Sequence, residues 1–198
     1  MNLVEDGSIK ALKDAGCITV VTAIESGDEH IRNNILKRNM TEKQILDACS
    51  VFRKHGLKIY IGNMIGLHDE TLDMSFKTVE LNARCKPSYS NVSIYMPYPG
   101  TELCEYSRQK GYFSGDVDSI GWSTNNRSTM NIKDAKKIDR LHHLFSAGAA
   151  FPFLMPFIRM LINMPMTGLY HLWFHCHRAW CYFFKVRYMD LAELFIRE

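Results

Sequence analysis

The sequence has 198 residues, of which 46% are hydrophobic and 23% are charged, and its net charge is +3. This length accommodates one domain with a sizeable core, or one domain with a helical appendage. The composition excludes an intrinsically disordered chain, and the small net charge without a Lys/Arg-rich run argues against a nucleic-acid partner. Residues 1–16 (MNLVEDGSIKALKDAG) contain no apolar segment of the signal-peptide type. We therefore expect a cytoplasmic protein.

The cysteines of the chain do not have the spacing of a metal-binding loop. No two of them form a CxxC pair, and no three form the CxxxCxxC pattern that lets one loop hold three irons of a four-iron cluster. The nearest two, Cys176 and Cys181, lie in an aromatic segment, where packing is the favoured interpretation. We expect reduced thiols and no metal site. The six cysteines are Cys17, Cys49, Cys85, Cys104, Cys176 and Cys181.

The first half of the chain alternates predicted strands and helices. Residues 8–15 predict a short helix that ends at Gly16, a typical position for a glycine. The β-branched run at 17–24 (CITVVTAI) predicts a strand buried on both faces of a parallel sheet. Helices are expected at 28–37 and from Thr41, whose hydroxyl is a good N-cap. This order is the beginning of a βα repeat.

The repeat continues to about residue 110. Strands are predicted at 57–67 (LKIYIGNMIGL) and 91–96 (NVSIYM), and helices at 71–85 and 101–110. The resulting βαβαβα order predicts an α/β fold with a parallel sheet. An eight-stranded barrel takes about 200–250 residues, so three strands are an incomplete architecture. Their bare edges invite pairing with another chain.

The composition changes after residue 114. Residues 115–131 are polar and turn-rich, which predicts a linker or an active-site loop. Residues 141–158 and 160–177 contain no Asp, Glu, Lys or Arg, but three prolines argue against membrane-spanning helices. Kinked helices that pack on a barrel and helices that lie against a membrane surface both remain open. We therefore expect three regions: 1–114, 115–131 and an apolar helical region at 132–198.

Four stretches, in this order and spacing, carry a family resemblance that covers residues 15–103. Together they resemble the radical S-adenosylmethionine (SAM) proteins that often carry an N-terminal cobalamin-binding domain. The family usually has Pro-Gly where this chain has His68-Asp69, although Asp is also a good turn residue. The stretches are residues 23–29 (AIESGDE) with 35–41 (ILKRNMT), 62–71 (GNMIGLHDET), 78–82 (TVELN) with 86–87 (KP), and 95–103 (YMPYPGTEL).

The resemblance implies the second half of a TIM-type (β/α) barrel that binds SAM at its C-terminal mouth. In the family a 4Fe-4S cluster binds SAM and cleaves it to a 5′-deoxyadenosyl radical, which modifies a small-molecule substrate. The resemblance leaves cobalamin-dependent methyl transfer and rearrangement open. Because the cluster motif is missing, we expect the isolated chain to be inactive and to need a missing N-terminal half or a partner half-barrel. The alternative is a non-catalytic half-barrel module that binds a ligand or associates with a membrane through its apolar helices.

The resemblance also implies roles for residues near the first strand. Glu25 follows this strand, where its carboxylate would accept hydrogen bonds from the SAM ribose, and Ser26 would add a polar contact. Arg38 would pair with the SAM carboxylate, because a guanidinium makes a bidentate, charge-assisted contact, and Lys37 is the second candidate. A helix cap for Glu25 and carbonyl capping for the two cations are the structural alternatives.

The later stretches imply an adenine site and a substrate cavity. The second strand would pass beside the adenine, and Tyr95, Pro97 and Tyr98 would line the cavity. For each of these, packing or strand termination is the alternative, and a buried Asn63 would need a hydrogen-bond partner. His171 and His175 have the i,i+4 spacing of metal ligands, but without an acidic or cysteine partner at motif spacing we expect no metal there. The adenine residues are Gly62, Asn63, Met64 and Ile65.

Overall fold

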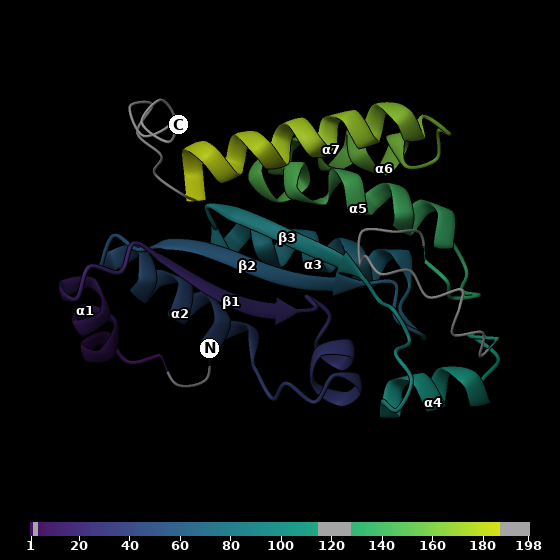
Figure 1. Cartoon of the computed structure of the whole chain (residues 1–198), viewed down its shortest axis with the longest axis horizontal. Helices are drawn as coiled ribbons and strands as arrows, with labels where there is room; N and C mark the ends of the chain where they lie inside the picture. Colours follow the sequence, from purple (N-terminus) through teal and green to yellow (C-terminus); the bar gives the residue numbers. More distant parts are fainter. Residues whose placement is uncertain (2–3, 115–127, 187–198) are drawn as a thin grey trace, which may run out of the picture.

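The computed structural model describes residues 1, 4–114 and 128–186, which form an α/β fold (Figure 1). Three parallel strands in the order β1-β2-β3 form its sheet. The α/β prediction with a parallel sheet is therefore confirmed, and the described strands do not close into a barrel. The elements are α1 (Asp6–Asp14), β1 (Thr19–Glu25), η1 (Ile31–Ile35), α2 (Glu42–Lys54), β2 (Lys58–Ile65), α3 (Leu72–Cys85), β3 (Tyr89–Ile94), α4 (Glu102–Gln109), α5 (Ala135–Ala150), η3 (Pro152–Leu154), α6 (Met155–Leu161), α7 (Thr167–Cys181) and η4 (Tyr182–Val186).

Thr41 and Thr71 are the N-cap residues of α2 and α3. The hydroxyl of Thr41 accepts a hydrogen bond from the backbone N–H of Gln44, and that of Thr71 accepts one from Met74. Each satisfies a backbone donor that the first helical turn leaves without a partner. The helix expected at 28–37 is confirmed in part: residues 29–35 are helical, and their last five residues form the π-type turn η1. The buried Arg32 guanidinium occupies this loop and binds the carbonyl oxygens of Ser26 and Met40.

One face of the sheet is covered by α2 and α3, which lie behind the strands in Figure 1. Along β2, Ile59 and Ile61 are buried in this helix-side core. The opposite face, here called the open face, is formed by Val21, Ala23, Tyr60, Gly62 and Met64.

The open face corrects one expectation about the first strand. Val21 is 75% exposed, so the prediction that this strand is buried on both faces is wrong. The reason is that β1 is an edge strand and that, in the described part of the chain, α2 and α3 cover the other face of the sheet. A β-branched sequence suits a covered strand, but it does not show whether the covering layer is present.

The C-terminal helices extend the structure beside β3. Helix α5 packs against α3 and β3 through Ile138, Leu141 and Phe145, and α7 packs on α5. Gly148 permits the close contact of α5 with α3, since a Cβ atom there would lie 2.8 Å from Val79 Cγ1. Figure 1 shows α5 and α7 stacked above β3.

Two further predictions concern the linker at 115–131 and the absence of membrane-spanning helices. Residues 115–127 of the predicted linker lie outside the described residues, so the division at 114 and 131 stays a prediction. In the described part of the chain, no helix combines the length and apolar character needed to cross a bilayer.

Candidate functional site

The three parallel strands end at the same edge of the sheet, here called the carboxyl edge, on the right in Figure 1. The loop from Glu25 to Met40 and the loops after β2 and β3 all begin there. In barrels of βα units, the loops at this end hold the substrates. The side chains of these loops are therefore the candidates for a binding site.

At the end of β1, an ion pair joins two residues that the sequence analysis selected separately. Arg38 Nη2 lies 2.7 Å from Glu25 Oε1, and the side chains are 41% and 20% exposed. The register with β2 shifts between Ala23 and Glu25, and Glu25 has a φ of 69°. A positive φ is uncommon for a residue other than glycine and is seen often at functional sites. The backbone therefore aims the Glu25 carboxylate at the carboxyl edge beside a cation.

Ser26 makes its hydrogen bonds inside the loop. It is fully buried, and its Oγ accepts a hydrogen bond of 3.2 Å from the backbone N–H of Asp28. The neighbouring Gly27 lies so close to α3 that a Cβ atom would be 2.3 Å from the carbonyl oxygen of Lys77. Its N–H donates to Thr78 Oγ1 at 2.9 Å. These contacts fix the loop that carries Glu25 against α3.

The four residues predicted beside adenine divide between the two faces of the sheet. Gly62 and Met64 lie on the open face. Ile65 is fully buried in the core with α3 and α5. Asn63 also faces the helices, where its amide donates to Asn82 Oδ1 at 3.1 Å and to the Asn91 carbonyl oxygen at 2.9 Å.

A buried carboxyl group organises the loop after β2. Glu70 Oε2 accepts hydrogen bonds from the backbone N–H groups of Gly66 (2.7 Å) and Leu67 (3.1 Å), and Ser75 Oγ donates to Oε1 at 2.8 Å. Burial raises the pKa of Glu70 to about 7, although these three donors favour the carboxylate. Glu70 therefore holds the shape of the loop, and the residue is only 5% exposed.

The two residues before Glu70, His68 and Asp69, contact tyrosines of α4 and of the segment that follows it. His68 is buried, and its ring centre lies 4.4 Å from that of Tyr106. The Asp69 carboxylate accepts hydrogen bonds from the hydroxyls of Tyr112 (2.7 Å) and Tyr106 (3.0 Å), and its φ is 61°. Asp69 therefore has the left-handed backbone conformation that favours glycine, which Asp also tolerates in turns. Burial lowers the pKa of His68, which favours the neutral ring.

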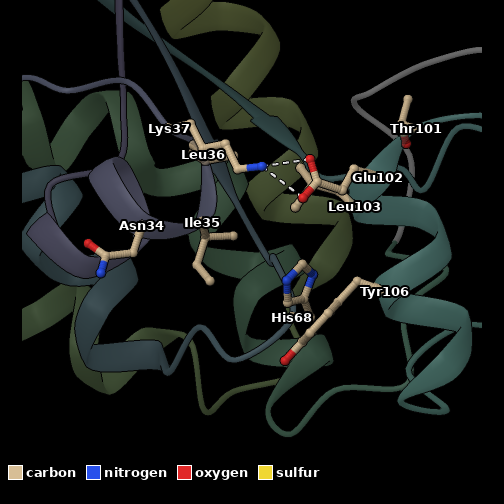
Figure 2. Close-up of a pocket in the computed structure, with 9 residues that line it drawn as sticks. All are labelled: Asn34, Ile35, Leu36, Lys37, His68, Thr101, Glu102, Leu103 and Tyr106. Atoms are coloured by element: carbon tan, nitrogen blue, oxygen red, sulfur yellow. Dashed lines mark hydrogen bonds and ion pairs between the residues drawn. The ribbon is translucent and has the colours of Figure 1, made fainter.

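A pocket of about 460 Å³ lies between η1 and α4 (Figure 2). Figure 2 shows His68 and Tyr106 side by side, and Lys37 turned toward Glu102. Lys37 Nζ lies 2.7 Å from both Glu102 oxygens, in a pair so exposed that it adds little stability. The lining residues are Asn34, Ile35, Leu36, Lys37, His68, Thr101, Glu102, Leu103 and Tyr106.

The predicted cavity residues do not line this pocket. Tyr95 and Pro97 are buried, and Tyr98 is 46% exposed. Of the predicted site residues, Lys37 is the one in the lining. Sequence reasoning missed the contribution of His68, Tyr106 and Glu102. The His68-Asp69 departure from the family pattern is the signal that could have indicated the first of them.

The described histidines, cysteines and acids do not include three side chains grouped to hold a metal ion. His143 and His171 form a pair, with Nε2 and Nδ1 3.2 Å apart. The i,i+4 pair His171 and His175 stacks with ring centres 6.5 Å apart.

Comparison with known sequences supports the family resemblance. Residues 2–81 match the family described as the Radical SAM superfamily. The chain is also 35% identical, over 107 residues, to a protein of Pyrococcus horikoshii that is named an uncharacterized methyltransferase. This match covers 54% of the chain and 23% of the relative's length. The chain thus spans about a quarter of that protein.

Proposed function

We propose that this chain, whose residues 2–81 are a radical SAM superfamily domain, is the second half of a barrel and binds SAM at its carboxyl edge. The observation that carries the proposal is the Glu25–Arg38 pair, which brings the two predicted SAM ligands within 2.7 Å of each other at the end of β1. The open face beside them would be the inner wall of the barrel.

The residues at this edge fit the polar groups of SAM. The Glu25 carboxylate would accept hydrogen bonds from the ribose hydroxyls, and the Arg38 guanidinium would pair with the carboxylate of the methionine part. Gly62 has no side chain to keep an adenine ring from the strand, and Met64 offers an apolar contact next to it. Asn63 and Ile65 would act from the helix side, by holding β2 in place.

The residues of this chain do not fit a 4Fe-4S cluster. The sequence lacks the CxxxCxxC pattern, and the described part of the chain offers no group of three suitable side chains. In our proposal the cluster ligands and the covering half of the barrel come from residues outside this sequence. By itself the chain would bind SAM without cleaving it.

Within radical SAM chemistry, we favour methyl transfer. The name of the Pyrococcus horikoshii relative supports this reaction over rearrangement. Cobalamin dependence is part of the same proposal and rests on the family resemblance in the sequence. The alternative is a non-catalytic half-barrel that binds a ligand. Such a protein would function without a second half that carries a cluster.

Equilibrium dialysis with labelled SAM tests the proposed site in the whole chain. We expect Glu25→Gln and Arg38→Gln each to weaken SAM binding about tenfold or more, as expected for loss of a charge-assisted hydrogen bond. The matched control is the Arg84–Glu42 pair, which is of the same residue types (2.6 Å) but joins two helices. Glu42→Gln and Arg84→Gln should bind SAM normally. Absence of SAM binding, or equal loss in both pairs, would overturn the proposal.

A further inference from the structure

Helix α7 carries a second apolar stripe that no described element covers. Its first stripe, formed by Tyr170, Phe174, His177 and Cys181, is buried and faces the interior. The second stripe has the same helical spacing and therefore lies along one side of the helix. It is formed by Leu169, Leu172, Trp173, Cys176 and Trp180. Leu172 is 62% exposed and Leu169 is 55% exposed.

The segments on either side of α7 are also apolar and exposed. Before α7, Phe153 is 71% exposed and Phe157 is 59% exposed, and after it Phe184 is 59% exposed. The hydroxyl of Tyr170 donates to the carbonyl oxygen of Leu161 at 2.8 Å, which holds the end of α6 against α7. Monomeric proteins seldom expose this much apolar surface unless it binds something.

The charge of this region indicates what it binds. Residues 140–186 contain no Asp or Glu. Arg159 is paired with Asp73, whereas Arg178 and Lys185 lie next to aromatic rings. Lys185 Nζ lies 4.8 Å from the ring centre of Trp180. Tryptophan beside a cation at the edge of an apolar stripe is typical of helices that lie in a membrane interface.

We propose that the exposed stripe of α7 and the apolar segments around it lie in the surface of an anionic lipid bilayer. The helix would lie in the plane of the interface, with its buried stripe on α5 and its exposed stripe in the acyl region. A second copy of this chain is a poorer partner, because the contact would bring Arg178 and Lys185 of both copies together. This proposal does not depend on SAM binding.

Vesicle flotation tests the proposal with the whole chain, synthesised in a cell-free system with the vesicles present. We expect the chain to float with vesicles of phosphatidylcholine and phosphatidylserine, and less with phosphatidylcholine alone. Leu172→Glu should lower the floated fraction about tenfold, because a charge replaces an apolar group in the interface. The matched control is Leu12→Glu, since Leu12 is an exposed leucine of α1 (46%) and should have no effect.

Charge neutralisation separates the two parts of the interaction. Lys185→Gln should reduce flotation with anionic vesicles and leave the weaker binding to neutral vesicles unchanged. A chain that fails to float, or that pellets with and without vesicles, would overturn the proposal. So would equal effects of the two glutamate variants in chains with the same circular dichroism. A dimer in solution that Leu172→Glu dissociates would instead assign the stripe to a protein contact.

Discussion

At the scale of single residues, Glu70 makes stability depend on pH. In the unfolded chain this carboxyl group releases its proton near its ordinary value of 4.5, but in the fold its pKa is about 7 because it is buried. Between these values the unfolded chain binds fewer protons than the folded one. Stability therefore falls as the pH rises from 4.5 to 7, by roughly 3 kcal/mol from this group.

Glu70→Gln should remove this part of the pH dependence, because its amide oxygen can still accept from the backbone without ionising. We expect the variant to gain stability relative to the original chain between pH 5 and pH 8, measured as the free energy of unfolding in denaturant. Other groups, including His142, whose pKa burial lowers to about 3, titrate in both proteins and cancel in the difference. A difference that stays constant with pH would show that Glu70 is ionised in the fold throughout this range.

The identity of a residue predicted that its side chain needs a partner, but it did not predict which residue that partner is. A buried polar Asn63 required a hydrogen-bond partner, but that partner is Asn82 on α3, and nothing in the local pattern around β2 indicates it. Glu25 and Arg38 were assigned to different groups of SAM, the ribose and the carboxylate, and not to each other. Their contact follows from the loop held by the buried Arg32, and a single sequence does not reveal that fold of the loop.

At the scale of elements, the order of strands and helices was predictable, because hydrophobic runs, threonine caps and glycine stops are local signals. The burial of each strand was not predictable, since it depends on which helices pack on each face of the sheet. The pocket beside α4 was also missed, because it joins the 34–37 segment to residues 101–106 across the fold.

The contact between α5 and α3 can be tested at Gly148. A Cβ atom there would lie 2.8 Å from Val79 Cγ1 and 3.1 Å from Ile158 Cδ1, so Gly148→Val should destabilise the chain by about 1–3 kcal/mol through overpacking. Gly168→Val is the control, because no atom lies within 4 Å of a Cβ atom at this position of α7. Thermal unfolding of both variants measures the effect. Equal stability would mean that α5 does not pack this tightly on α3.

At the scale of the whole molecule, the structure is a parallel sheet with helices on one face, further helices beside β3, and an open face that ends at the Glu25–Arg38 pair. The matched superfamily domain, residues 2–81, includes β1, β2 and most of α3. This arrangement leads us to propose a half-barrel whose open face becomes an inner wall when the rest of the barrel is present.

The most direct measurement is an NMR titration of the labelled chain with SAM, which detects weak binding residue by residue. Our account predicts concentration-dependent shifts at Glu25, the Gly62 amide and the Met64 methyl group, which Arg38→Gln reduces. No shifts at these three positions, or shifts confined to residues around His68, would contradict a SAM site at the end of β1.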